Sequence, residues 1–272
     1  MLLYEIMAIR KYFFITKLYF ERLFAYRARL LVWQSRDLLS FLIFPFIWLT
    51  IYGERTDILG YSKHDMVTYY IVAAVVNLIA MSYIARVTQQ AINRGDINGI
   101  LARPVSFLWY QTTQAVSYKL LGCVTIAFIV LGLKLFWPQL FVLPTDPLQI
   151  LFFLVSLFLA FVLSHLIMLG IGVSAFWFGE INALDQSHDI LRTVFAGQIA
   201  PLTFYPQFVQ TVGNFLPFKF MSYVPAQIYL GRMNVVESLQ AILLAGIWVA
   251  VLWIFLSVMY KRALRQYEGV GI

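Results

Sequence analysis

The sequence predicts an all-α integral membrane protein with six transmembrane helices, mainly because of its composition and the length of its apolar runs. Of its 272 residues, 61% are hydrophobic and only 12% are charged, whereas a soluble domain has about 45–50% apolar and about 25% charged residues. Short polar segments separate apolar runs that approach the ~20 residues a membrane-crossing helix needs. This pattern indicates one transmembrane domain over residues 1–272.

Six segments are predicted to cross the membrane. They are residues 31–52, 66–85, 109–133, 148–176, a fifth segment after residue 189, and 239–260. Within the fifth segment, Arg192 and Gln198 are polar intrusions, and Pro201 and Pro206 interrupt the chain. Because proline removes a backbone donor and disturbs a helix interior, we expect the fifth span to be the least regular of the six.

Residues 8–28 are predicted to form an interfacial helix rather than a span. At about 100° per residue, Arg10, Lys17 and Glu21 lie within a wedge of about 40°, while Tyr12 and Phe13 are among the aromatic residues on the other side. Such a helix lies in the headgroup region with its charges toward water. We expect it to lie along the inner membrane surface and to brace the first span from the side.

The lysines and arginines predict the orientation of the chain in the membrane. With both termini in the cytoplasm, fourteen basic residues lie on the inner side and five on the outer side. Cytoplasmic segments of membrane proteins carry the excess of lysine and arginine. The segments 86–106 and 179–189 are therefore expected in the cytoplasm, and 201–234 outside.

The segment 86–106 is the clearest polar interruption between two apolar runs. It is predicted to contain a short amphipathic helix whose apolar residues are Ile92, Ile97, Ile100 and Leu101. Pro104 is expected to begin the next span, where its missing N–H costs least. A short helix that carries both charges and apolar side chains suits docking to another protein, although a solvated connector would have the same pattern.

The segment 205–231 is predicted to dip back into the outer leaflet without crossing it. Pro206, Pro217 and Pro225 divide it into pieces far shorter than the ~20 residues of a span. Backbone groups freed by these prolines must be buried in protein or face a watery cavity. Two half-helices that meet near residues 216–218 satisfy these limits. The candidate side chains for an external gate, or for an interfacial anchor, are Phe215, Phe218, Phe220 and Tyr223.

Three of the polar residues inside predicted spans are candidates for a specific role. His165 and Asn77 are candidates for the transport pathway, since ionisable and polar groups in a membrane tend to face a bundle interior or cavity. Each could instead bond a neighbouring helix, and Lys119 could extend to the inner interface or pair with an acidic group. The histidines at 64, 165 and 188 have no metal-ligand spacing, so neither a metal site nor a catalytic site is expected.

Two segments resemble the ABC type-2 transporter permeases, and in particular their short, six-span bacterial branch. Residues 94–106, RGDINGILARPVS, resemble the loop before the third span of that family. Residues 197–206, GQIAPLTFYP, with 216–218 and with YVPAQIYLG at 223–231, resemble its region between spans five and six. The distinctive motifs cover about a fifth of the chain, while the layout of apolar runs agrees along its whole length.

The resemblance implies the membrane subunit of an exporter in the bacterial inner membrane. Two permease subunits, identical or different, would form the pathway, and two cytoplasmic ATPases would dock beneath them. The cytoplasmic coupling helix would lie within 94–106 and the external re-entrant half-helices within 205–231. The residues expected to couple to the ATPase are Arg94, Asp96, Ile97, Ile100, Leu101 and Arg103.

The sequence also indicates where ATP would bind. A phosphate-binding loop requires glycine followed by lysine, and none of the fifteen glycines has that neighbour. ATP and Mg²⁺ are therefore expected on a partner subunit, with no cofactor on this chain, no enzymatic activity of its own, and lipids but no nucleic acid among its partners. An ATP-independent secondary transporter or channel is the alternative, although no span centre carries an acidic residue of the kind such transporters use. A membrane-embedded enzyme or scaffold would need clustered catalytic groups, and none is evident.

Overall fold

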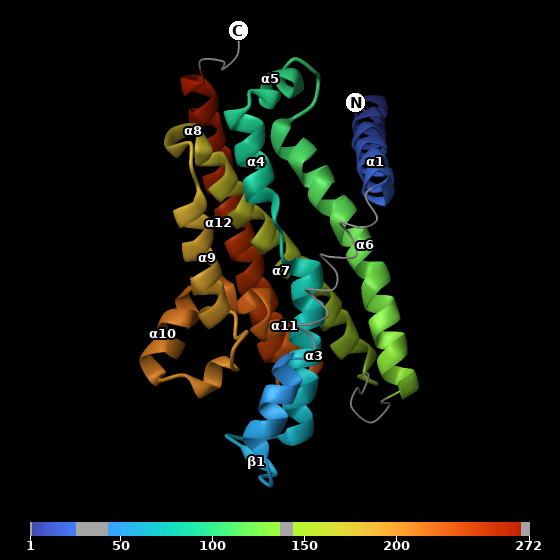
Figure 1. The fold of residues 1–272 in the computed structure, drawn as a ribbon, viewed down its shortest axis with the longest axis vertical. Coiled ribbons are helices and arrows are strands. Elements are labelled where there is room, and N and C mark those ends of the chain that lie inside the picture. The colour runs from blue at the N-terminus through green and yellow to red at the C-terminus, as the bar shows by residue number, and fades with distance from the viewer. Residues whose placement is uncertain (1, 26–42, 137–143, 268–272) are drawn as a thin grey trace.

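A computed structural model describes residues 2–25, 43–136 and 144–267 as a bundle of long helices with short helices at both ends (Figure 1). Four stretches within these ranges are helical, long and apolar enough to cross a membrane. They are Lys63–Asn93, Phe107–Gly132, Pro147–Phe178 and Val235–Gln266. Most of the predicted first span lies outside the described residues, and its described remainder is the helix Ile43–Tyr52.

The central helix of the bundle is α7 (Pro147–Val173), which contacts α3 (Lys63–Ala80) and α12 (Val235–Gln266). Their first turns follow from the sequence. Ser62 and Asp65 form a reciprocal capping box at α3, and Asn234 and Glu237 form another at α12. Pro147 occupies the first turn of α7, where it costs no hydrogen bond. These caps satisfy backbone donors that a helix start leaves free.

The predicted span 66–85 ends earlier than expected. The helix stops at Ala80, residues 81–83 are not helical, and α4 (Ile84–Asn93) and α5 (Asp96–Leu101) follow. Lys119 satisfies the end of α3, because its Nζ donates to the Leu78 carbonyl at 3.2 Å and also to the Met81 carbonyl. A cation at a helix C-terminus also interacts favourably with the helix dipole.

Helix α1 (Leu2–Ala25) packs against α6 (Phe107–Phe136). Three residues of α1, spaced by four and three positions, form hydrogen bonds to α6 or to the residue before it. The Tyr12 hydroxyl accepts from the Ser106 amide at 3.0 Å, the Thr16 carbonyl accepts from Ser117, and the Tyr19 hydroxyl donates to Tyr110 at 2.6 Å. Residues at this spacing lie on one face of a helix. The structure therefore shows α1 in contact with α6. The predicted bracing of the first span concerns residues that lie largely outside the described ranges.

The side chain of Phe13, expected opposite the charges of α1, is 70% exposed and does not belong to the seam with α6. Its contact with lipid stays a prediction. One local expectation for this region, which concerns Pro104, is wrong. Pro104 does not begin a helix. It lies in a turn, and α6 begins only after Ser106, whose carbonyl accepts the first helical bond from Tyr110. The carbonyl of Pro104 accepts instead from Lys11.

The predicted fifth span is much shorter than a membrane-crossing helix. After α8 (Ala175–Phe178), helix α9 spans only Asn182–Phe195, which is about 21 Å at 1.5 Å per residue against a hydrocarbon core of ~30 Å. Gly197 ends this region with a φ of +72°, in the left-handed region that favours glycine. The number of six spans therefore stays a prediction.

Short helices follow α9, as the three prolines of this region predict. They are η1 (Leu202–Phe204), α10 (Gln207–Phe215), η2 (Pro217–Met221) and α11 (Tyr223–Tyr229). The bend between α10 and η2 lies at Leu216, whose backbone is extended. None of these pieces is long enough to cross a membrane. Their placement within the outer leaflet stays a prediction.

The two ends of the molecule differ in what they carry (Figure 1). The start of α1, helix α5 and the end of α12 lie at one end, as the predicted sidedness requires. The small hairpin of β1 (Asp57–Ile58) and β2 (Tyr61–Ser62) lies at the other end, with α10 also in that half. The hairpin turn places Leu59 and Gly60 at positive φ, as a two-residue type I′ turn needs.

Candidate coupling segment and buried polar contacts

Helices α4 and α5 form the candidate coupling segment. Gly95 separates them with a φ of +75°, which lets the chain turn sharply between two helices. Asp96 lies in the first turn of α5, where a negative charge is favourable. Arg94 and Asp96 are both exposed. The segment therefore presents charged side chains at the end of the molecule where α5 lies (Figure 1).

Two of the residues expected to contact an ATPase are covered by the chain itself. Ile97 is 0% exposed and Ile100 is 9% exposed, and both pack into a core cluster with Ile92 and Phe107. An amphipathic pattern does not specify which body covers the apolar face, and here that body is the rest of the chain. The coupling residues that stay exposed are Arg94, Asp96, Leu101 and Arg103.

The amide side chains of α4 hold the turn between α8 and α9. Gln89 donates to the Gly179 carbonyl and to the Glu180 carboxylate, each at 3.0 Å, and Asn93 donates to the same Gly179 carbonyl at 2.9 Å. Gly179 has a positive φ, so the turn depends on glycine at this position. These bonds attach the coupling segment to the turn before α9.

An ion pair completes this attachment. Arg86 Nε lies 2.8 Å from Asp185 Oδ2, and the Asp185 side chain is only 8% exposed. The carboxylate is thus nearly buried and has a charged partner, while the guanidinium keeps contact with solvent. We call the set that joins α4 to the α8–α9 region the α4 clamp. Its members are Arg86, Gln89, Asn93, Gly179, Glu180 and Asp185.

Helix α9 turns its polar residues toward the bundle. Asp185, His188 and Arg192, spaced by three and four residues, are all buried. Arg192 lies 3.3 Å from the Asn77 amide oxygen and 3.7 Å from Asp189. The sequence predicts a cytoplasmic polar segment at 179–189 and places Arg192 as a polar intrusion in the fifth span. The helical spacing of these polar residues was the signal that could have placed them on one buried face.

The two pathway candidates inside predicted spans bond neighbouring elements in this structure. The Asn77 oxygen accepts from Gln198 at 2.8 Å, as well as from Arg192. His165 has one ring nitrogen 3.3 Å from Ser82 Oγ and the other 3.0 Å from Thr112 Oγ1. Asn77 thus joins α3 to α9 and the residues after it. His165 of α7 joins the non-helical residues after α3 to α6. Their role in transport stays a prediction.

The external aromatic residues fall into two groups. Phe218 and Phe220 are 7% and 3% exposed and belong to a core cluster with α7 and α12, and Tyr223 packs against it. Phe215, in contrast, is 77% exposed at the end of α10. A side chain that closes an exit must be free to meet its counterpart, so Phe215 is the candidate that this conformation leaves available.

The ring-bearing side chains of α3 hold the start of the same region. Tyr69 donates to the Gly197 carbonyl at 2.6 Å, and Tyr70 donates to the Ile199 carbonyl. These carbonyls follow the end of α9 and have lost their helical partners. We call these two tyrosines and their two acceptors the tyrosine anchor.

Within residues 2–25, 43–136 and 144–267, no group of three His, Cys, Asp or Glu side chains could hold a metal ion.

The fold and this segment define a class: an α-helical, multi-pass membrane protein whose charged end segment is attached to its interior helices. The family follows from comparison. A family model described as an ABC-2 family transporter protein matches residues 38–271, so the chain belongs to the ABC-2 type transporter membrane family. This confirms the resemblance carried by segments 94–106 and 197–231. No curated protein matches the chain.

Membership of this family indicates the general function of the chain. The chain is a permease subunit of an ABC transporter and not a nucleotide-binding subunit. Permeases of this family generally work with ABC ATPase partners.

Proposed function

We propose that this chain forms the translocation pathway of an ATP-driven exporter, together with a second permease subunit, in a bacterial inner membrane. Separate ATPase subunits would bind ATP and Mg²⁺ and dock on the exposed charges of α4 and α5. Both termini would face the cytoplasm. The second permease is either another copy of this chain or a different one.

The observation that carries this proposal is the α4 clamp. A docking segment can transmit motion only if it is attached to the elements that must move. Arg86, at 2.8 Å from the nearly buried Asp185, and Gln89, bonded to Gly179 and Glu180, attach α4 directly to the start of α9. A displacement of α5 by an ATPase would therefore be passed to α9, and from α9 to the short helices beyond Gly197.

The docking contact itself would be mainly polar. Since Ile97 and Ile100 are covered by the chain's own core, the side chains available to a partner are Arg94, Asp96 and Arg103, with Leu101 as the apolar member. Charge-assisted hydrogen bonds at such an interface each contribute roughly 1.5–3 kcal/mol. One reversed charge in this set would then weaken docking severely.

The test reverses one charge at each end of the molecule. The chain is co-expressed with an ABC ATPase encoded beside it, and the ATPase bound per permease is measured after purification. Asp96→Arg should lower ATPase affinity at least ~10-fold, while the permease stays folded and loses only about 1 kcal/mol of stability at the start of α5. Glu54→Arg, an exposed residue beside the hairpin, is the matched control and should bind normally.

Two results would count against the proposal. If Asp96→Arg bound the ATPase as tightly as wild type and still supported its activity, the docking surface would not lie on α5. If the wild-type complex moved its substrate inward when supplied with ATP, the exporter assignment would be wrong, whereas the docking surface would be unaffected.

A further inference from the structure

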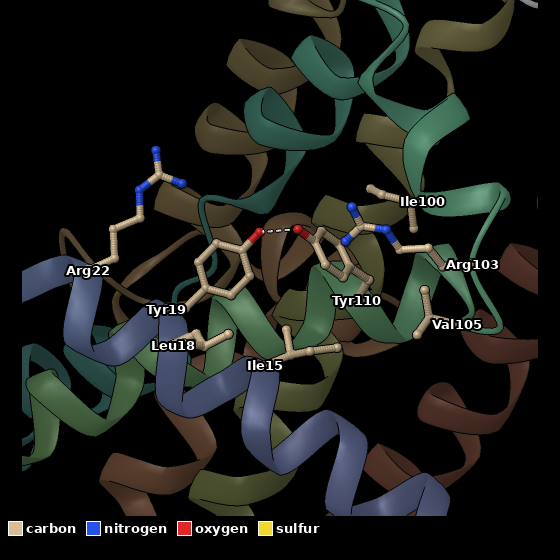
Figure 2. Close-up of a pocket in the computed structure, with 8 residues that line it drawn as sticks. All are labelled: Ile15, Leu18, Tyr19, Arg22, Ile100, Arg103, Val105 and Tyr110. Carbon is tan, nitrogen blue, oxygen red and sulfur yellow. Dashed lines mark hydrogen bonds between the residues drawn. The ribbon is translucent and has the colours of Figure 1, made fainter.

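A cavity of about 260 Å³ lies between α1, α5 and the start of α6. Its apolar wall consists of four aliphatic side chains, which are Ile15 and Leu18 of α1, Ile100 of α5, and Val105 of the following loop. Figure 2 shows these side chains below and beside a hydrogen-bonded tyrosine pair, with an arginine on each side of that pair. The cavity thus combines an apolar wall with a polar edge that carries two cationic side chains.

Two arginines place positive charge at this edge of the cavity. Arg22 and Arg103 are both exposed, and neither forms an ion pair with any side chain that the structure describes. They come from different elements, α1 and the loop after α5, and flank the tyrosine pair in Figure 2. Guanidinium groups bind phosphate oxygens with strong, directional hydrogen bonds, so this edge favours an anion rich in oxygen.

The tyrosine pair adds a donor to the same edge. The hydroxyls of Tyr19 and Tyr110 are 2.6 Å apart, and Gln114 donates to Tyr19. Tyr19 donates its hydroxyl proton to the Tyr110 oxygen. The Tyr110 hydroxyl keeps its own proton, for which the described residues offer no acceptor. Burial raises the pKa of the Tyr19 phenol well above its usual value, so this hydroxyl is neutral at physiological pH.

We propose that this cavity binds the phosphate group of an anionic phospholipid, with Arg22, Arg103 and the tyrosine pair around the phosphate. The apolar side chains favour a lipid over a free phosphate ion. Leu18 is 49% exposed, and the neighbouring Phe14 is 59% exposed on the same helix. An acyl chain would remove this surface from water, whereas a small anion would leave it uncovered.

The expected location supports the same ligand. The predicted orientation places α1 and α5 at the inner membrane surface, where anionic lipid headgroups lie. The lipid would join α1 to the α5–α6 loop, which already contact each other through Lys11 and the Pro104 carbonyl. This inference concerns lipid binding and uses no ATP, so it can fail or succeed independently of the proposed function.

The test measures bound lipid on the full chain. The purified protein is stripped of endogenous lipid, titrated with dioleoylphosphatidylglycerol or dioleoylphosphatidylcholine, and analysed by native mass spectrometry. Inorganic phosphate is tested separately by thermal unfolding. The double variant Arg22→Gln/Arg103→Gln is compared with Arg10→Gln/Lys261→Gln, which removes two exposed charges at the same end without altering the cavity.

Wild type should hold one phosphatidylglycerol per chain more tightly than phosphatidylcholine. The cavity variant should bind it at least ~10-fold more weakly, since two charge-assisted bonds are lost, and Arg22→Lys/Arg103→Lys should recover part of that loss. Equal weakening in the surface control would overturn the proposal, because it would show general attraction of basic residues to anionic lipid. Stabilisation by inorganic phosphate as large as that by lipid would overturn the choice of a phospholipid.

A second variant addresses the possibility that the double variant does not fold. Leu18→Trp keeps both arginines but fills the cavity with a larger side chain, and Leu18 is exposed enough to accept it. This variant should lose the tightly held phosphatidylglycerol while keeping the wild-type unfolding temperature in the absence of lipid. Retention of that lipid with wild-type affinity would refute the site.

Discussion

The α4 clamp holds the chain at the start of α9, and the tyrosine anchor holds it just after the end of α9. The two sets use different kinds of contact. In the clamp, Arg86 pairs with Asp185 on a surface that solvent reaches, since the arginine side chain is 64% exposed. In the anchor, Tyr69 is 0% exposed and donates to the Gly197 carbonyl at 2.6 Å. A charged, partly solvated contact can shift at modest cost, whereas a buried neutral contact resists change. We therefore expect the contacts of the clamp to rearrange at lower cost than those of the anchor.

The largest expected effect breaks the anchor through its backbone. At Gly197 a Cβ would lie 2.6 Å from the Tyr69 hydroxyl, and the φ of +72° disfavours a side chain. Gly197→Val should therefore destabilise the protein by about 3 kcal/mol, through left-handed strain and overpacking together. Thermal unfolding in detergent measures this.

Gly246→Val is the matched control for that variant. A Cβ at Gly246, within α12, meets no atom within 4 Å, and valine has a higher helix propensity than glycine. Stability should therefore be unchanged or slightly higher. Equal loss in the two variants would show that Gly197 has no special role in the anchor.

The next effect tests the clamp as an ion pair. Arg86→Ala leaves the nearly buried Asp185 carboxylate without its charged partner, and should cost about 2 kcal/mol. The charge-swapped variant Arg86→Asp/Asp185→Arg should recover part of this loss, because it restores the attraction with reversed polarity. Measured unfolding temperatures that show no recovery in the swap would mean that packing, and not charge, holds the clamp.

A smaller effect tests the hydrogen bond of the anchor. Tyr69→Phe removes the hydroxyl that donates to Gly197 and should cost about 1 kcal/mol, the range found for single hydrogen bonds in proteins and membranes. Tyr205→Phe is the control, because the buried Tyr205 hydroxyl has no hydrogen-bond partner among the described residues. That substitution should be neutral or stabilising in the same unfolding assay.

The smallest effect compares both regions in salt. Screening weakens partly exposed ion pairs much more than neutral buried bonds. The loss of unfolding free energy caused by Arg86→Ala should therefore be smaller at ~1 M salt than at low salt, by at most about 1 kcal/mol. The loss caused by Tyr69→Phe should be the same at both salt concentrations. Equal salt dependence of the two variants would remove the physical distinction between clamp and anchor.

Several local predictions depended on where the prolines lie. Pro206 precedes α10 and Pro217 begins η2, in agreement with the predicted short helices, because proline cannot continue a helix interior. Pro225 lies in the first turn of α11 and does not interrupt it. Pro104 is the exception, since Lys11 and Tyr12 from a distant helix contact its turn. A contact of that sequence separation leaves no local signal.

The sequence by itself determined that this chain is an α-helical membrane protein and that it resembles ABC-2 permeases. Apolar run length and composition suffice for this, because a lipid environment requires helices whose backbone bonds are satisfied internally. Only the tertiary structure decided which apolar faces are covered, as with Ile97 and Ile100, and which polar groups meet across the chain. Arg86 and Asp185 are 99 residues apart, and an amphipathic pattern specifies that a face is buried without specifying what covers it.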